Sequence, residues 1–99
     1  MNNLRSKIII GVWSLSGDYG KVNTNHVNKI IGECIKKKFF EFDTAPTYGK
    51  GKIDKLLSKF KKNNKKIKIN TKCGYNSLFK KTFKIKDIKE SIDKSLKLY

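Results

Sequence analysis

The chain has 99 residues, of which 24 are Lys or Arg and 8 are Asp or Glu, so its formal net charge is +16 at pH 7. This length allows a single domain, and a patterned sequence with a hydrophobic fraction of 37% argues against disorder. The apolar runs are too short for a membrane-spanning helix or for the core of a signal peptide, so we expect no membrane partner and a cytoplasmic location.

The positive charge by itself favours contact with polyanions, because its field acts over a Debye length of about 8 Å. The basic residues are nearly all lysine, and Arg5 is the one arginine. Proteins that read nucleic acid rely on arginine forks and aromatic stacking, whereas lysine, asparagine and isoleucine are abundant together here, which favours a bias in codon composition over a nucleic-acid role. A small basic α/β module that binds nucleic acid or another polyanion, without enzymatic activity, is the alternative function.

Segments with strand and helix patterns alternate along the chain. Residues 7–13, 39–43 and 67–72 are short apolar runs bounded by glycine, proline or polar turns, which is typical of buried strands. Apolar residues at steps of three and four predict three helices: after Thr24 as a cap, Val27, Ile30, Ile31, Cys34 and Ile35; then Ile53, Leu56, Leu57 and Phe60; and last Ile85, Ile88, Ile92 and Leu96. This order predicts parallel strands with right-handed crossovers in one domain without a linker.

Polar side chains alternate with apolar ones in the second and third predicted strands. If Phe42 and Ile69 lie under the helices, then Asp43 and Lys72 both lie on the opposite face, at the carboxyl ends of their strands. In a barrel this face is the interior, and its upper rim is where active sites form. The sequence therefore predicts a site that contains this pair.

Asp43, Tyr48 and Lys72 have the chemistry to form one proton donor. A phenol is a weak acid, with a reference pKa of about 10, and a neighbouring ammonium group favours its ionised form. A carboxylate would in turn keep the lysine charged and oriented. Each residue also has an ordinary interpretation: Asp43 as the cap of the turn before Pro46, Tyr48 as a surface aromatic and Lys72 as a solvated lysine.

These residues form a pattern that resembles the N-terminal part of the aldo-keto reductase family. The pattern is Phe42-Asp43-Thr44-Ala45, then Tyr48-Gly49, then Thr71-Lys72; upstream, Ile10-Gly11-Val12-Trp13 and Gly17-Asp18-Tyr19-Gly20 are similar to the family's first strand and loop, and residues 91–96 to the helix before its fourth strand. The likeness covers nearly all of the chain. Because a complete (β/α)₈ TIM barrel needs roughly 250 residues, the resemblance implies an α/β fold with about the first three β/α units of a partial barrel, as one partial domain over residues 1–99.

The resemblance also implies an activity: NADP(H)-dependent reduction of a small aldehyde or ketone. Tyr48 would protonate the carbonyl oxygen, Lys72 would make the tyrosine more acidic, and Asp43 would pair with Lys72 and border the cofactor. Residues Gly11, Val12 and Trp13 would line the nicotinamide, and no metal is implied.

In the family, a catalytic histidine ends the fourth strand, and later loops hold most of the dinucleotide. Neither lies within the 99 residues. We therefore expect an N-terminal fragment that is inactive as an isolated chain, binds NADP(H) poorly by itself, and is truncated or completed by a second chain that carries the later strands. His26, the one histidine, is expected to be an exposed helix residue that cannot take over this role.

Several further residues are interpreted structurally. Lys38 lies where the family usually has a glycine that ends the first helix in a left-handed conformation, so a residue with a Cβ is expected to carry that strain. Gly49 and Gly51 are expected to be turn residues, because two glycines alone are a weak signal for a phosphate loop. Cys34 and Cys73 lie far apart without metal-ligand spacing, and we expect both to be reduced thiols.

Overall fold

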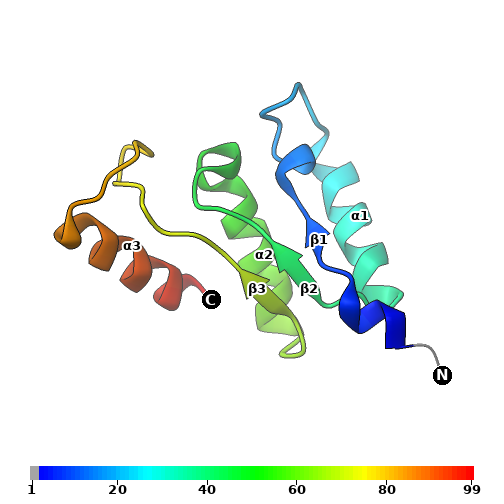
Figure 1. Ribbon diagram of the computed structural model, residues 1–99. Helices are drawn as coiled ribbons and strands as arrows, with labels where there is room; N and C mark the ends of the chain where they lie inside the picture. The colour runs from blue at the N-terminus through cyan, green and yellow to red at the C-terminus, as the bar shows by residue number, and fades with distance from the viewer. Residues whose placement is uncertain (1–2) are drawn as a thin grey trace.

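The computed structural model describes residues 3–99 as a parallel sheet with helices beside it (Figure 1). The elements are the short 3-10 helix η1 (Asn3–Lys7), strand β1 (Ile10–Gly11), the 3-10 helix η2 (Trp13–Leu15), helix α1 (Thr24–Lys36), strand β2 (Glu41–Asp43), the 3-10 segment η3 (Tyr48–Gly51), helix α2 (Lys52–Asn63), strand β3 (Lys68–Asn70) and helix α3 (Ile85–Leu98). The alternation of strands and helices predicted from the sequence is confirmed. No helix within residues 3–99 has both the length and the apolar character that crossing a membrane requires.

β2 is the central strand of the sheet. It pairs in parallel with β1, where Phe42 lies opposite Ile10, and with β3, where Phe42 lies opposite Ile69. Phe42 is fully buried, and it belongs to a core that joins the sheet to α1 and α2: Val12, Val27, Ile31, Phe42, Ile53, Leu57 and Ile67. The helices α1 and α2 thus cover one face of the sheet, and Figure 1 looks toward the other face.

The strands are shorter than the sequence predicted. The predicted strand over residues 7–13 is paired only at Ile10–Gly11, because a 3-10 helix ends at Lys7 and another begins at Trp13. Single backbone hydrogen bonds continue the ladders by one residue: the Val12 N–H donates to the Asp43 carbonyl at 3.2 Å, and the Thr44 N–H donates to the Asn70 carbonyl at 2.8 Å. Of the predicted strand regions 39–43 and 67–72, only residues 41–43 and 68–70 form the regular ladder.

The two ends of α1 illustrate one wrong and one confirmed prediction. The cap is Asn23 and not Thr24, because Asn23 Oδ1 accepts the N–H groups of Asn25 at 2.9 Å and His26 at 3.2 Å. At the other end, Lys38 has φ +69°, so the left-handed position carries a side chain as predicted. The Phe39 N–H bonds to the Cys34 carbonyl at 2.9 Å, which closes the helix in a Schellman arrangement.

α3 is attached to the rest of the fold differently from the other helices. It lies on the β3 side of the sheet, after a long connection from β3 (Figure 1). None of its residues is buried. The hydroxyl of Tyr99, which follows the helix, donates a hydrogen bond to Asp54 Oδ1 on α2 and so links the two helices.

Candidate active site

Asp43 lies at the carboxyl end of the central strand. Because the side chains of a strand alternate between its faces, the burial of Phe42 under the helices directs Asp43 to the uncovered face. Its carboxylate is about half exposed, with a side-chain exposure of 47%. The site therefore begins on an element that the hydrophobic core holds rigidly.

Lys72 follows β3 and reaches across to Asp43. Its Nζ donates to Asp43 Oδ2 at 3.1 Å and to the backbone carbonyl of Thr44 at 2.7 Å. Burial opposes the charge on this lysine, but the hydrogen bond to Asp43 and the nearby Tyr48 phenol outweigh it and raise the pKa of Lys72 above its usual value. The ammonium group is thus kept charged and is held at a fixed point by two acceptors.

The Lys72–Asp43 salt bridge contributes little to stability. The two side chains are 43% and 47% exposed, and ion pairs with this exposure are typically worth about 0–1 kcal/mol. What the pair does is to fix the position of a positive charge. That position is next to a phenol.

Tyr48 begins η3, and its ring lies beside the ammonium group. Lys72 Nζ is 5.3 Å from the ring centroid of Tyr48, which is within the range of about 6 Å for a cation–π contact. The structure therefore brings together Asp43, Tyr48 and Lys72, the three residues predicted as catalytic. The prediction of a shared face for Asp43 and Lys72 is confirmed by their hydrogen bond.

Trp13 extends this group of side chains into an aromatic surface. Its ring centroid lies 6.4 Å from that of Tyr48 and 4.4 Å from that of Tyr19. The indole is 46% exposed, so one side of it is open to a ligand.

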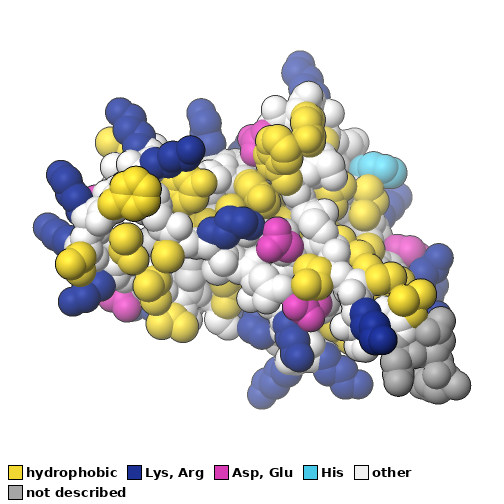
Figure 2. Space-filling view, viewed as in Figure 1, with side chains coloured by type: hydrophobic (Ala, Val, Ile, Leu, Met, Phe, Trp, Pro, Cys, Tyr) yellow, Lys and Arg dark blue, Asp and Glu magenta, His cyan; other side chains and the backbone are white. Residues whose placement is uncertain are grey.

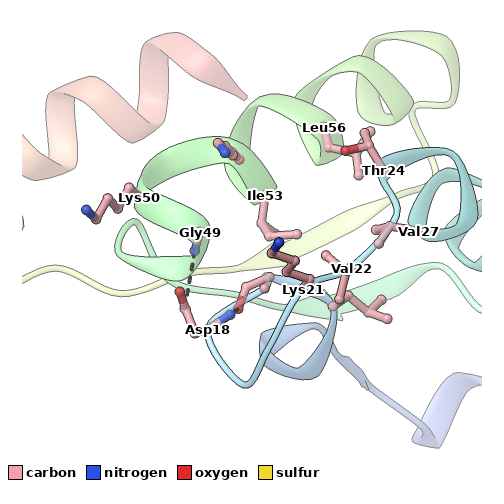
Figure 3. A pocket seen from close by; sticks show the side chains of 13 residues that line it. Asp18, Lys21, Val22, Thr24, Val27, Gly49, Lys50, Ile53 and Leu56 are labelled. Atoms are coloured by element: carbon pink, nitrogen blue, oxygen red, sulfur yellow. Dashed lines mark hydrogen bonds between the residues drawn. The ribbon is translucent and has the colours of Figure 1, made fainter.

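The loop that carries Tyr48 is fastened to the loop after η2. Asp18 Oδ2 accepts the N–H of Gly49 at 3.3 Å, as Figure 3 shows. Ser16 Oγ in turn accepts the N–H of Asp18 at 3.1 Å and donates to the Trp13 carbonyl at 2.6 Å. We call this chain of hydrogen bonds, from Trp13 through Ser16 and Asp18 to Gly49, the loop latch. It connects the segment that carries Trp13 to the segment that carries Tyr48.

Gly49 is required by the geometry of the loop latch. It has φ +58°, and a Cβ at this position would lie 2.8 Å from the Ser16 carbonyl oxygen. The next two residues are also left-handed, with φ +53° at Lys50 and +88° at Gly51. Gly49 and Gly51 are thus turn residues, as predicted.

A cavity of about 520 Å³ lies behind the loop latch, between it and the first turns of α1 and α2. Figure 3 shows Lys21 and Val22 close to Ile53 of α2 at this cavity.

The role of Asp18 in the loop latch was not predicted. Its place between two glycines marked a loop, but nothing in the sequence indicated a bond to a residue 31 positions away.

The predicted cofactor contacts were Gly11, Val12, Trp13 and Asp43, and they fall into two groups. Gly11 pairs with Asp43 across the sheet, is exposed, and would have nothing within 4 Å of an added Cβ, so a flat ring has room against its backbone. Trp13 and Asp43 are also about half exposed. Val12 is fully buried in the core, so only its backbone could contribute.

The histidine and the two cysteines lie outside the group formed by Asp43, Tyr48, Lys72 and Trp13. His26 is exposed on the first turn of α1, as predicted. Cys34 and Cys73 are free thiols, and burial is the main cause that raises the pKa of Cys34. Within residues 3–99, no three His, Cys, Asp or Glu side chains are grouped so that they could hold a metal ion.

The lysines do not gather on one surface of the visible face. Figure 2 shows Lys and Arg side chains spread around the outline of the molecule, and hydrophobic side chains gathered over α3. A nucleic-acid interface usually concentrates basic residues in a patch or stripe. This distribution gives no such stripe on the face that carries Asp43.

Comparison with known proteins agrees with the geometry. The model of the Aldo/keto reductase family matches residues 7–99. No curated protein matches the chain. Because the family match extends over nearly the whole sequence and over every residue of the candidate site, this chain belongs to the aldo/keto reductase family.

Proposed function

We propose that these 99 residues supply the proton-donating part of an NADP(H)-dependent carbonyl reductase, within the first three β/α units of a TIM barrel. The observation that supports this most directly is the position of the Lys72 ammonium group. It is bonded to Asp43 Oδ2 and the Thr44 carbonyl and lies 5.3 Å from the ring centroid of Tyr48.

In this proposal the carbonyl oxygen of an aldehyde or ketone accepts the phenolic proton of Tyr48. NADPH, when bound, supplies the hydride that the carbonyl carbon takes up. The charge of Lys72 favours the phenolate that Tyr48 becomes after giving up its proton, and Asp43 keeps Lys72 oriented. A positioned general acid typically contributes a rate factor of about 10²–10⁴.

The residues of this chain would hold only one end of the cofactor. The exposed faces of Gly11 and Trp13, next to Asp43, would accept the nicotinamide. The family resemblance implies that the phosphates and a catalytic histidine are held by later parts of a barrel. We therefore expect a polypeptide of these 99 residues to show no reduction of carbonyl compounds by NADPH.

The role of Tyr48 can be tested in a covalent fusion, in which residues 1–99 replace the equivalent segment of an active aldo-keto reductase. Tyr48→Phe is expected to lower kcat by about 10²–10⁴, measured as NADPH oxidation with an aromatic aldehyde. Tyr19→Phe is the matched control, because it also removes one hydroxyl group from an aromatic ring beside Trp13. The structure does not place the Tyr19 ring at Lys72, so kcat should be almost unchanged.

Two results would contradict the proposal. The first is a fusion in which Tyr48→Phe retains the parent kcat. The second is turnover by the isolated 99-residue polypeptide that Tyr48→Phe abolishes, since the site would then be complete without later strands. Trp13 is the one tryptophan of these 99 residues. In a fusion whose remaining segment has no tryptophan, its fluorescence should be quenched when NADPH binds, which adds a direct binding signal.

Polyanion binding is the weaker proposal. It is supported by the net charge of +16, but the lysines of the visible face are spread around its outline (Figure 2). It would gain support if the isolated polypeptide bound single-stranded DNA in the micromolar range with an affinity that falls steeply as salt rises.

A further inference from the structure

The peptide group that joins Tyr48 to Gly49 is held by a residue from another loop. Its N–H, on Gly49, donates to Asp18 Oδ2 at 3.3 Å, as Figure 3 shows. Because a peptide group is planar, a hydrogen bond to this N–H restrains the ψ angle of Tyr48. The N–H of Tyr48 itself donates to the Ala45 carbonyl at 3.1 Å. Tyr48 is therefore held on one side by its own turn and on the other side by Asp18.

The backbone that follows Tyr48 is strained. Three consecutive residues are left-handed, with φ +58° at Gly49, +53° at Lys50 and +88° at Gly51. This conformation is unfavourable for Lys50, because Lys50 has a Cβ. A strained backbone persists only where the surrounding structure determines its conformation. Asp18 supplies such a contact from outside the turn.

Asp18 is itself oriented by a buried side chain. Ser16 is only 9% exposed, and its Oγ accepts the Asp18 N–H at 3.1 Å and donates to the Trp13 carbonyl at 2.6 Å. The backbone of Ser16 also lies against Gly49, since a Cβ added to Gly49 would lie 2.8 Å from the Ser16 carbonyl oxygen. The Asp18 carboxylate thus projects from a loop that packs on the turn after Tyr48.

The position of the Tyr48 ring depends on this turn. The ring lies 6.4 Å from the Trp13 ring and 5.3 Å from Lys72 Nζ, measured from its centroid. A shift of the Tyr48 backbone would move the phenol relative to both neighbours. Catalysis is sensitive to such shifts, because a displacement of about 1 Å can lower a rate by about 100-fold.

We propose that Asp18 is a positioning residue for Tyr48: through the Gly49 N–H, it holds the phenol at Lys72 and beside Trp13. The inference rests on the proposed function, because it gives Asp18 a role in the same proton transfer. Asp18 acts through geometry and not through its charge, since its carboxylate accepts one backbone N–H. The side-chain oxygen of an asparagine can accept the same bond.

The experiment uses the covalent fusion described above, with the aromatic aldehyde as substrate. Asp18→Ala removes the acceptor, so kcat should fall by about tenfold while KM stays almost unchanged. Asp18→Asn keeps an oxygen acceptor and should retain at least about half of the parent kcat. Asp93→Ala is the matched control: Asp93 is also exposed but lies on α3, so kcat should match the parent.

A double variant separates positioning from a general structural role. If Asp18 acts only through Tyr48, Asp18→Ala should change kcat by less than about twofold in the Tyr48→Phe background. General loosening of the fold would lower kcat in both backgrounds. Amide hydrogen exchange reports the bond directly: exchange at Gly49 should be faster in Asp18→Ala than in the parent. Exchange at Phe39, whose N–H bonds to the Cys34 carbonyl, should not change.

Three results would overturn the inference: the parent kcat in Asp18→Ala, an equal loss in Asp18→Asn, or an equal loss in the Tyr48→Phe background. These outcomes are distinct from the test of the proposed function. If Tyr48→Phe lowers kcat and Asp18→Ala does not, Tyr48 is the proton donor and Asp18 is an ordinary turn residue. If Tyr48→Phe itself retains the parent kcat, the proposed function fails and this inference fails with it.

Discussion

The segment from β1 to β3 and the segment after β3 bury their apolar residues to very different extents. In the part of the chain that the structure describes, the buried hydrophobic residues all lie between Val12 and Ile67, whereas α3 buries no residue. Yet the sequences of α1, α2 and α3 carry apolar stripes of the same kind. The difference teaches that a helical pattern shows which face a helix would bury, while the presence of a partner decides whether that face is buried.

The strongest test of this difference is the substitution of a core residue in the first segment. Phe42→Ala deletes the fully buried side chain of the central strand, so the free energy of unfolding should fall by about 3–5 kcal/mol. Ile85→Ala, in the stripe of α3, should change it by no more than about 0.5 kcal/mol because Ile85 is 72% exposed. Urea titrations followed by circular dichroism measure both, and equal losses would show that α3 is packed as tightly as the core.

The loop latch offers a second test within the first segment. Gly49→Ala should lower the free energy of unfolding by about 2 kcal/mol, because the residue is left-handed and its Cβ would meet the Ser16 carbonyl oxygen at 2.8 Å. Gly32→Ala is the matched control: Gly32 lies in α1 with open space around it, so the same substitution should stabilise the chain by about 0.5–1 kcal/mol. Effects of the same sign at both positions would contradict this account.

The bond between Tyr99 and Asp54 tests the junction of the two segments. Burial, the largest effect, raises the pKa of Asp54, and the hydrogen bond from Tyr99 and the charge of Lys94 oppose it. Because the folded pKa exceeds the unfolded value of about 3.9, the contribution of Asp54 to stability is greatest below that value and is lost as pH rises through the folded pKa.

Tyr99→Phe removes the hydroxyl group that donates to the Asp54 carboxylate. The free energy of opening of α3 in amide exchange should therefore fall by about 1 kcal/mol at pH 7 and by less at pH 4. Amide exchange of α3 at the two pH values measures this loss. Asp54→Asn retains an acceptor for Tyr99 without a charge, so in this variant the attachment of α3 should no longer weaken with rising pH. If wild type and Asp54→Asn show the same pH dependence, the burial of the Asp54 charge does not control the junction.

Much of the fold could be predicted because it follows from periodicity. The three apolar stripes predicted the helices, and the alternation around Phe42 and Ile69 placed Asp43 and Lys72 on one face, where they form a hydrogen bond. The left-handed conformation of Lys38 was also predicted. The predictions of the helices and of the shared face depend on neighbours in the chain or on the alternation of side chains along a strand, whereas the prediction for Lys38 depended on the family resemblance.

The predictions that failed depended on choices among similar residues. Asn23 and Thr24 are both good caps, and the backbone geometry selects Asn23. The strand over residues 7–13 is shortened because Trp13 begins a 3-10 turn that brings its ring to Tyr19 and Tyr48. No local pattern distinguished these outcomes.

The sequence by itself determined the order of elements, the shared face of Asp43 and Lys72, and the residue types of the proton donor that we propose. Only the tertiary structure decided that Lys72 lies 3.1 Å from Asp43, that Asp18 holds Gly49 across 31 positions, and that α3 keeps its apolar stripe uncovered. The physical reason is that periodicity and chemistry are properties of short segments. Distances between loops, and the covering of a helix, depend on how segments far apart in the chain pack together.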